Sequence, residues 1–386
     1  MKILHTIRSV NPAGGGVIEV VRQFSGVMER QGHTVAVASL DAPGDAWVKE
    51  FPHRVHALGP VATGYGRTTN FTSWLRDHHT EFDCVVVNGL WQFNSFGTRQ
   101  ALHGTGTPYF VFPHGMLDPW FKRAYPLKHL KKWLYWPWAE YRVLRDARAA
   151  LFTCEEEKIL ARQSFWLYSC REQVVPLGIA TPPGDAEKQR SLFLQQFPGL
   201  AGQRIILFLG RIHEKKGCDL LLQAFAPFAK KDPRLQLVIA GPDQTGWRAA
   251  LEKLAETLGV TRQVSWPGML GGDLKWGAFH AAEAFALPSH QENFGIVVAE
   301  AAACGLPVLI SNQVNIWREI EADGAGLVAP DTLDGTSRLL SGWLEMPDAA
   351  KSEMRARAQK CFNDRFEIGH ATGQFLKTLR ECGVKG

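Results

Sequence analysis

The sequence predicts an α/β protein made of two Rossmann-like domains, each with a doubly wound parallel sheet. Its 386 residues are more than one hydrophobic core usually organises. Apolar runs of strand length alternate with helical patterns, which is typical of a parallel sheet covered by helices. The alternation stops near residue 181 and then begins again. We therefore expect an N-terminal domain over 1–180 and a C-terminal domain over 181–365, with a cleft between the carboxyl ends of their strands.

The expected strands are short and mostly apolar. In the N-terminal domain they are Lys2–Thr6, Thr34–Leu40, Cys84–Asn88, Tyr109–Phe112, Ala150–Thr153 and Val174–Leu177. A break rich in Pro and Gly follows in ATPPGDAEKQRS and FPGLAGQR. In the C-terminal domain the strands are RIILFLG, LQLVIAG, QVSWPG, EAFALPS, PVLIS and GLVAP. Helical patterns occupy Cys218–Lys230, Trp247–Leu258, Phe294–Cys304 and much of the chain from Thr332 to Arg380.

The composition excludes several classes of protein. Hydrophobic residues make up 45% and charged residues 21%, the balance of a globular chain rather than a disordered one. The formal net charge of +5 is too small for a dedicated nucleic-acid binder unless it is concentrated in one region. Seven scattered cysteines without a C-x-x-C pair indicate neither a disulfide framework nor a structural zinc site. With no secretory signal and no apolar run of transmembrane length, we expect a cytoplasmic protein.

The first candidate site is the turn from Asn11 to Gly16, between the first strand and a helix. Gly15 and Gly16 would allow the backbone to approach a phosphate or a sugar. The alternative is a tight turn that binds nothing. The turn lacks G-x-G-x-x-G, and no acidic residue sits convincingly at the end of the second strand to hold an adenosine ribose; Asp41 is the nearest candidate. Both observations weaken a dehydrogenase interpretation.

The second candidate site is GRIHEKKG, residues 210–217, directly after the first strand of the C-terminal domain. Arg211 and Lys216 lie there in a glycine-bounded loop, where two cations could neutralise a diphosphate leaving group. The alternative is a solvated basic loop.

The third candidate site is SHQENFGIVVAE, residues 289–300. We expect Glu292 just ahead of a helix and Glu300 two turns inside it, on the order of 12 Å apart at about 1.5 Å per residue, a separation that suits the two ends of a sugar nucleotide. The backbone N–H groups of Phe294 and Gly295 could face phosphate. Alternatively, Glu292 caps the helix and Glu300 is a solvated charge. Because Glu300 is surrounded by Val and Ala, however, we expect it to have a polar partner.

The fourth candidate site is FVFPHGMLDPW, residues 110–120, where His114 follows a strand. A neutral imidazole can exchange hydrogen bonds with a sugar hydroxyl, although a histidine is as often a satisfied structural group.

Together, these turns resemble the retaining glycosyltransferases of family 4 (glycosyl transferases group 1), which have the GT-B fold of two facing Rossmann-like domains. The resemblance covers almost the whole chain. Its most specific part is Glu292-x7-Glu300 within ENFGIVVAE, supported by the order and spacing of the other turns. It implies that the N-terminal domain binds the acceptor, the C-terminal domain binds the donor, and residues 366–386 return to the N-terminal domain.

By this resemblance, Arg211 and Lys216 bind the donor diphosphate, Glu300 the ribose and Glu292 the transferred sugar. The implied donor-binding residues are Gly15, Gly16, Arg211, Lys216, Glu292, Asn293, Phe294, Gly295 and Glu300. The implied catalytic residues are Glu292, His114, Lys216 and Arg211.

The implied reaction transfers a hexose from a nucleoside diphosphate sugar to a hydroxyl of a glycan or lipid-linked acceptor, with retained anomeric configuration. GDP-mannose and UDP-hexoses both remain open as donors. No cofactor is implied, and no metal either, because the two cations and the helix N-terminus supply the positive field. Asp118 is the only carboxylate near the His114 motif, and nothing places it at an anomeric carbon. We therefore favour same-face attack over a covalent intermediate.

Residues 120–148 differ from the rest of the chain. Eight Lys or Arg residues lie in 122–148 against Glu140 and Asp146, a local net charge of +6 that accounts for the excess of the whole chain. Basic residues interleaved with Trp and Tyr suit an acceptor surface or an anionic membrane surface at the inner face of the membrane. The residues assigned to this surface are Trp120, Lys122, Arg123, Lys128, Lys131, Lys132 and Trp133. The alternative is an ordinary helix with solvated cations, interrupted by Pro137.

Two other functions remain open. A sugar-nucleotide epimerase of GT-B-like fold would bind the same donor, but the Glu292/Glu300 spacing argues against it. A non-catalytic sugar-nucleotide-binding subunit would not need Arg211, Lys216, Glu292 and Glu300 together.

Overall fold

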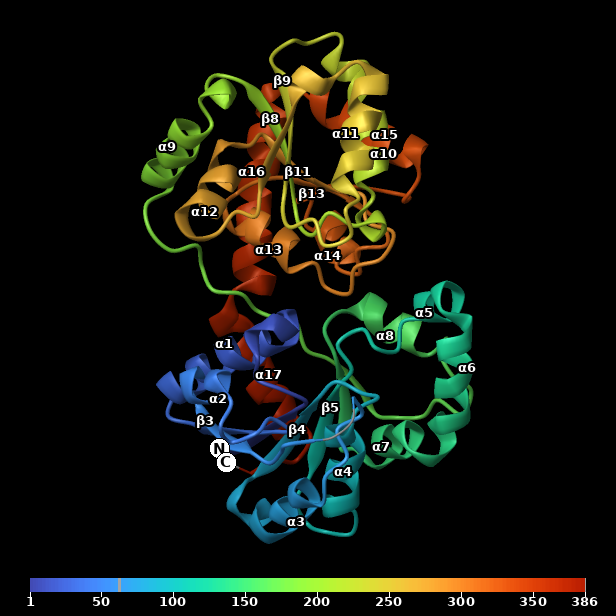
Figure 1. Ribbon diagram of the computed structural model, residues 1–386. Coiled ribbons are helices and arrows are strands. Elements are labelled where there is room, and N and C mark those ends of the chain that lie inside the picture. Colours follow the sequence, from blue (N-terminus) through green and yellow to red (C-terminus); the bar gives the residue numbers. More distant parts are fainter. Residues whose placement is uncertain (62–63, 386) are drawn as a thin grey trace. The chain divides into compact units, whose positions relative to one another are not determined.

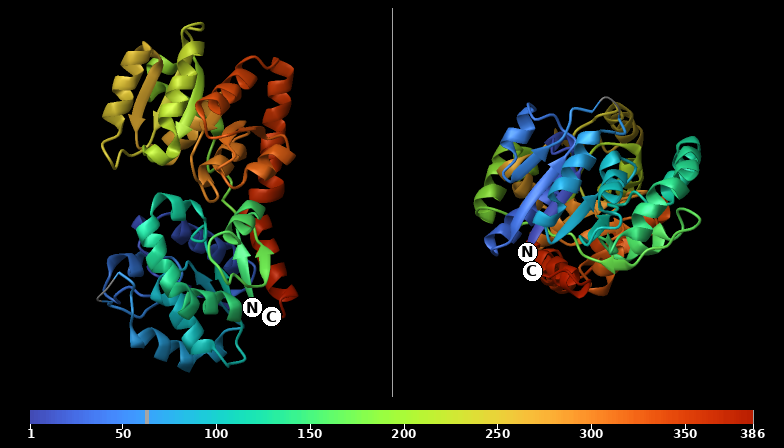
Figure 2. Two further views of the ribbon diagram at one scale, coloured as in Figure 1. Left: turned by 90° about the vertical axis from the view of Figure 1, so that its right-hand side faces the viewer. Right: turned by 90° about the horizontal axis from the view of Figure 1, so that it is seen from below.

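The computed structural model describes residues 1–61 and 64–385. The chain divides into two compact units (Figures 1 and 2). The N-terminal unit comprises Met1–Ala180 together with the chain from Glu367 onward, and the C-terminal unit comprises Thr181–Phe366. Within the part that the structure describes, no helix combines the length and apolar character needed to cross a membrane.

The sheet of the N-terminal unit has seven strands in the order β3-β2-β1-β4-β5-β6-β7, all parallel. The strands are β1 (Lys2–Ile7), β2 (Thr34–Ser39), β3 (Arg54–Ala57), β4 (Cys84–Asn88), β5 (Tyr109–Phe112), β6 (Ala149–Phe152) and β7 (Glu172–Val174). The order reverses between β1 and β4. Parallel-sheet proteins bind ligands at such a reversal, beside the carboxyl ends of the strands.

The helices of the N-terminal unit cover its sheet (Figure 1). They are α1 (Gly16–Arg30), α2 (Ala46–Glu50), α3 (Thr69–His78), α4 (Phe93–Leu102), α5 (Trp120–Ala124), α6 (Pro126–Tyr135), α7 (Glu140–Asp146), α8 (Glu155–Ala161) and α17 (Ile368–Glu381). The last of these returns to α1, where the ring centroids of Phe375 and Phe24 lie 5.9 Å apart. A π-helical turn at Phe362–Phe366 precedes it.

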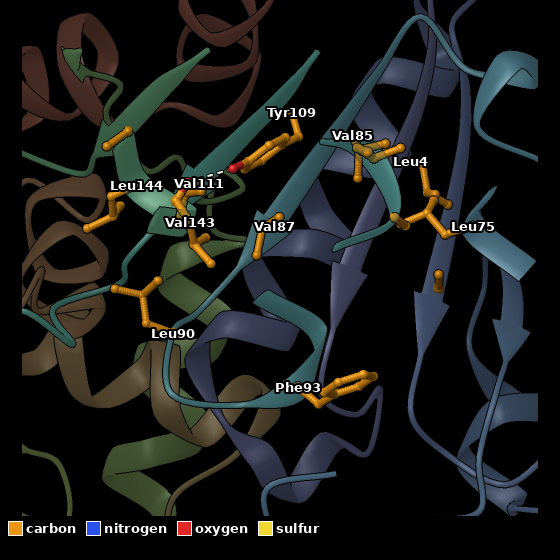
Figure 3. Packing of buried hydrophobic residues seen from close by; sticks show 14 of the residues in the cluster. Leu4, Leu75, Val85, Val87, Leu90, Phe93, Tyr109, Val111, Val143 and Leu144 are labelled. Atoms are coloured by element: carbon orange, nitrogen blue, oxygen red, sulfur yellow. Dashed lines mark hydrogen bonds between the residues drawn. The ribbon is translucent and has the colours of Figure 1, made fainter. Parts of the chain in front are cut away.

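The core of this unit is packed between the sheet and α3, α4 and α7 (Figure 3). Val85, Val87 and Val111 point from adjacent strands into one fully buried cluster, as nearly continuous apolar strands do in a sheet covered on both faces. The hydroxyl of Tyr109 donates to the carbonyl of Val143 at 2.7 Å, so the one polar atom of this ring is satisfied.

The C-terminal unit has six parallel strands in the order β10-β9-β8-β11-β12-β13. The strands are β8 (Arg204–Leu209), β9 (Leu235–Ala240), β10 (Val264–Gly268), β11 (Ala284–Leu287), β12 (Val308–Ser311) and β13 (Gly326–Ala329). The helices are α9 (Ala186–Gln196), α10 (Cys218–Ala229), α11 (Arg248–Leu258), α12 (Gly272–Ala281), α13 (Ile296–Ala303), α14 (Trp317–Ala322), α15 (Leu333–Leu344) and α16 (Asp348–Cys361). Here the strand order reverses between β8 and β11.

The structure differs from the predicted elements at three places. The edge strand β3 was not predicted, because RVHA is short and only half-buried and carries no apolar run. In place of the strand expected at Val174–Leu177, β7 begins two residues earlier and ends at Val174, because Pro176 has no N–H to donate to a ladder. The expected break after residue 180 contains α9, which packs against α12 (Figure 1).

The contact between α9 and α12 predicts an effect of substituting Gly277. A Cβ atom at this position would lie 2.2 Å from the carbonyl oxygen of Gln189. We expect Gly277→Ala to lower the free energy of unfolding of the C-terminal unit by roughly 1–3 kcal/mol, because the helices must move apart. Gly199→Ala is the matched control, since nothing lies within 4 Å of its Cβ. Differential scanning calorimetry that finds equal stability for the two variants would contradict the prediction.

Candidate functional site

The candidate site of the C-terminal unit lies at the reversal of strand order. The loop after β8 contains GRIHEKKG, and the loop after the adjacent strand β11 contains SHQENFG. The backbone N–H of His290 donates to the carbonyl of Lys215 at 2.8 Å, which joins the two loops. Gly217 has φ +67°, and a Cβ atom there would lie 2.3 Å from the carbonyl oxygen of Pro288. Only glycine allows this approach.

The two joined loops bring Lys216 and Glu292 together. The Lys216 ammonium donates to the Glu292 carboxylate, and the side chains are 12% and 23% exposed. Burial, together with the nearby cations Lys215 and Arg211, lowers the pKa of Lys216 to about 8. The contact with Glu292 opposes this shift, because a carboxylate favours the charged lysine. Two residues assigned from separate motifs therefore form one ion pair.

Glu292 does not cap the following helix, as one alternative had it. It forms a parallel bridge with Val314, and its backbone carbonyl accepts from Asn315 N–H at 3.0 Å. Helix α13 begins only at Ile296. Glu300 is therefore little more than one turn inside the helix rather than two. The separation expected between Glu292 and Glu300 assumed helical rise throughout, which does not apply to the non-helical residues before Ile296.

The partner expected for Glu300 is Lys275 of α12. Its ammonium donates to Glu300 Oε1 at 2.8 Å and lies 4.2 Å from the centroid of the Trp276 ring. Sequence reasoning did not identify Lys275, since the two residues are 25 positions apart and no motif joins them. The interaction gives Glu300 a partner and orients its carboxylate among apolar neighbours.

The other donor-binding residues assigned in the C-terminal unit lie in the same two loops. Arg211 is exposed. Phe294 is buried, with its ring edge-on to Phe366 at 5.5 Å between centroids, so only its backbone can face a ligand. Asn293 is half-buried, and Gly295 has φ +75° directly before α13. The first N–H groups of a helix point away from its body and attract anions.

In the N-terminal unit, the glycine turn follows β1. Gly15 has φ +84°, and Gly16 is the first residue of α1; both are exposed. Asp41 lies below the turn and is buried. It accepts from Ser9 Oγ at 2.5 Å, Val10 N–H at 2.8 Å and Trp47 Nε1 at 3.0 Å. Asp41 therefore supports the turn and is not available to a ribose, which agrees with the argument against a dehydrogenase.

His114 follows β5 in a left-handed conformation, with φ +50°. Asn88, at the end of β4, donates from Nδ2 to the carbonyls of Thr6 and Val86, so its Oδ1 faces His114 Nε2 at 3.2 Å. Because Asn88 Oδ1 can only accept, His114 Nε2 must carry the imidazole proton, and Nδ1 is left as a hydrogen-bond acceptor. Burial and the nearby His5 lower the pKa of His114 to about 3, which keeps the ring neutral. The sequence showed His114 but not Asn88.

A buried carboxylate also supports the His114 turn. Glu157 of α8 accepts from Gly115 N–H at 2.5 Å, Thr153 N–H at 2.7 Å and Thr153 Oγ1 at 2.6 Å. Asp118, the carboxylate considered in the sequence, accepts from Trp120 N–H at 2.7 Å. Both carboxylates thus hold backbone in the loop after β5.

The basic aromatic segment, residues 120–148, folds as α5, α6, a 3-10 turn at Trp136–Trp138 and α7. Helices α5 and α6 lie at the outer edge of the N-terminal unit (Figures 1 and 2), whereas α7 packs into the core. Helix α6 exposes apolar side chains: Leu127, Leu130 and Leu134, at spacings that place them on one face, are 77%, 54% and 60% exposed. Lys128 and Lys131 are exposed beside them. The cations of α5, Lys122 and Arg123, are exposed as well, whereas Trp120 is half-buried and Trp133 is 41% exposed.

Lys132 does not belong to the exposed surface to which we assigned it. Its ammonium lies 4.5 Å from the centroid of the Trp91 ring and 5.6 Å from that of Phe121, and burial lowers its pKa. It also interacts with the buried Glu140, which accepts from Trp91 N–H at 2.9 Å and from Ser95 Oγ at 3.0 Å. Helix α6 therefore has the reverse of the usual orientation of an amphipathic helix: Lys132 faces the protein, and the leucines face solvent.

Comparisons with known proteins agree with this architecture. The family model of "Glycosyl transferases group 1" matches residues 193–360, and that of "Glycosyl transferase 4-like domain" matches residues 15–178. A D-inositol 3-phosphate glycosyltransferase of Actinosynnema mirum is 41% identical over 143 residues, which cover 35% of this chain and 33% of the relative. The chain spans 33% to 61% of the length of such curated relatives.

Two solved structures share the fold over nearly the whole chain. Anabaena HepE in complex with UDP has a TM-score of 0.77 at 19% identity, covering 99% of this chain and 100% of that one. Sucrose-phosphate synthase from Thermosynechococcus elongatus has a TM-score of 0.76 at 20% identity, covering 98% of both. The two parallel-sheet units thus define a GT-B protein. The chain belongs to the glycosyltransferases of group 1, family 4 type.

The contact between Asn88 and His114 predicts a titration. We expect Asn88→Asp to raise the pKa of His114 by about 1 to 3 units, because a carboxylate at hydrogen-bonding distance stabilises the imidazolium. Nitrogen chemical shifts of the ring followed against pH give the value, with the exposed His103 as an internal reference. An unchanged His114 pKa in a folded variant would show that Asn88 does not set the state of this ring.

Proposed function

We propose that the protein is a retaining hexosyltransferase, acting on a nucleoside diphosphate sugar and a hydroxyl of a glycan or lipid-linked saccharide in polysaccharide or glycolipid biosynthesis. The observation that carries the proposal is the Lys216–Glu292 pair at the strand reversal of a family 4 type protein. A cation and a carboxylate that meet at this position can hold the charged and the hydroxylated parts of one donor.

The roles of the residues follow from their charges. The diphosphate attracts Lys216 and Arg211, which stabilise the charge that develops on the leaving group. When phosphate takes the Lys216 ammonium, the Glu292 carboxylate is released to accept hydrogen bonds from sugar hydroxyls. Glu300, oriented by Lys275, accepts the ribose hydroxyls. The N-terminus of α13 adds positive potential.

The donor is GDP-mannose or a UDP-hexose. The complexes of HepE with UDP and with UDP-glucose support the UDP-hexose alternative. We expect the cations of the site to replace a metal ion at the diphosphate. In the N-terminal unit, Gly15 and Gly16 approach the phosphate or the acceptor, and neutral His114 offers Nδ1 to a sugar hydroxyl.

Retention is proposed to occur by same-face attack. The acceptor oxygen forms the new bond to the anomeric carbon as the bond to the diphosphate breaks, and a departing phosphate oxygen takes the acceptor's proton. The backbone contacts of Asp118 and Glu157 support this choice, because both carboxylates near His114 already have hydrogen-bonding partners. Donor turnover with a labelled nucleotide sugar separates this function from an epimerase and from a binding subunit.

The acceptor side is assigned to the N-terminal unit. Its exposed leucines and cations on α6 suit the surface of an anionic membrane, which would make the protein peripheral on the inner face. Of the twelve large hydrophobic side chains exposed among residues 1–61 and 64–385, eight lie in 125–138 or at 166–167. Such a concentration is typical of an interaction surface rather than of scattered exposure.

The donor assignment predicts the effect of removing the lysine. We expect Lys216→Ala to weaken nucleoside diphosphate binding by about 100-fold, since hydrogen bonds to charged groups contribute about 1.5–3 kcal/mol. Lys216→Arg, which keeps a cation, should retain part of the binding. Calorimetry with UDP and GDP measures both, and sugar transfer should fall with Lys216→Ala and Glu292→Ala. Full transferase activity in either alanine variant with an intact fold would refute the assignment.

The membrane assignment makes a separate prediction. At low salt, the protein should float with vesicles that contain phosphatidylglycerol and not with phosphatidylcholine alone. Reversing the charge of Lys128 and Lys131 to Glu should weaken the binding by at least about tenfold, because each cation near the surface contributes about 1 kcal/mol. Reversing the exposed Lys230 and Lys231 of the C-terminal unit is the control. Equal flotation of both variants would remove the hypothesis.

A further inference from the structure

A groove of about 660 Å³ lies beside α6 in the N-terminal unit. Its walls come from α5, α6 and the segment 163–166, which follows α8. Leu130, Trp133 and Trp166 form apolar walls, and the two indole centroids are 5.7 Å apart. The volume falls in the range of small-molecule sites.

The floor of the groove is aromatic. Phe165 is buried there, with the ring of His129 stacked on it at 4.7 Å and that of Trp136 at 4.6 Å between centroids. The hydroxyl of Ser164 donates to the carbonyl of Leu117, and the indole N–H of Trp136 donates to the carbonyl of Trp166 at 2.7 Å. The segment 163–166 is therefore held in place by contacts with the rest of the unit.

Lys122 supplies a positive charge at the wall of this groove. Its side chain is exposed, and Arg123 lies next to it in α5. The groove thus combines an apolar interior with a cationic rim. The groove offers a free saccharide few polar side chains, because the hydroxyl of Ser164 already donates to backbone, which leaves Lys122, Gln163 and the ring nitrogens of His129.

We propose that this groove binds the hydrocarbon chain of a lipid phosphate, with the phosphate at Lys122. The inverted orientation of α6 supports this occupant, since the leucines beside the groove would rest in the same hydrocarbon layer. The inference rests on the proposed function and deepens it: the acceptor is a saccharide linked through phosphate to a lipid chain. The groove then holds the lipid chain of the acceptor.

Dodecyl phosphate below its critical micelle concentration tests the site by calorimetry with the whole chain. Dodecyl maltoside has the same chain with an uncharged sugar head, and maltose has no chain. We expect dodecyl phosphate to bind most tightly, dodecyl maltoside more weakly and maltose not at all. Lys122→Gln should reduce the affinity for dodecyl phosphate to that for dodecyl maltoside. Binding of maltose comparable to that of the alkyl compounds would overturn the proposal in favour of a glycan site.

A matched pair of tryptophans separates the groove from general surface hydrophobicity. Trp133→Ala should weaken dodecyl phosphate binding by at least about tenfold, whereas Trp138→Ala should leave it within twofold, because Trp138 is 68% exposed and lies outside the groove. Leu130→Gln repeats the test at an exposed leucine whose replacement leaves the core intact. Equal weakening by the Trp133 and Trp138 variants, or no binding by the unaltered protein, would overturn the proposal.

The donor site provides the independent readout. Lys216→Ala should weaken nucleoside diphosphate binding and keep dodecyl phosphate binding, whereas Trp133→Ala should weaken dodecyl phosphate binding and keep nucleoside diphosphate binding. If the unaltered protein binds nucleotide but not dodecyl phosphate, only the proposed lipid site is contradicted. Failure of nucleotide binding in the unaltered protein contradicts the proposed function.

Discussion

The candidate donor site depends on one constraint, the reversal of strand order that puts β8 beside β11. Because the sheet is parallel, the loops after these two strands leave from the same edge and must share one space. Gly217 allows them to touch, since a side chain there would meet the carbonyl of Pro288. The pairing of Lys216 with Glu292 follows from this proximity. In the proposed function, the diphosphate and the sugar of one donor are recognised by these two residues, which are 76 positions apart in the chain.

Buried polar side chains hold the loops of the N-terminal unit. Asp41 supports the glycine turn, Asn88 orients His114, and Glu157 accepts from the backbone of the same turn. Glu140 fixes the backbone at Trp91, and burial raises its pKa to about 7. A buried polar group is costly unless it is paired, so each of these contacts stabilises the loop in which it lies. These buried side chains thus position the residues of the turns.

The fold was predictable because its signal is local. Alternating apolar runs marked nearly every strand, and glycines marked the turns that follow them. The exceptions were physically weak signals: β3 has no apolar run, and β7 ends before Pro176. Candidate residues with a motif, such as Lys216 and Glu292, were also visible. Asn88, Lys275 and Glu157 were not, because each looks ordinary in its own segment and acquires a role only through a distant partner.

The sequence by itself determined the parallel sheets, the turns that carry charge and the concentration of cations and aromatics in 120–148. These properties depend on neighbouring residues and on the repeat of helix and strand. Only the tertiary structure decided which charges meet, which imidazole nitrogen carries a proton, and which face of α6 is turned to solvent. Lys132 shows the reason most clearly: its sequence neighbours indicate a surface cation, whereas packing against Trp91 and Phe121 turns it inward and leaves the leucines outside.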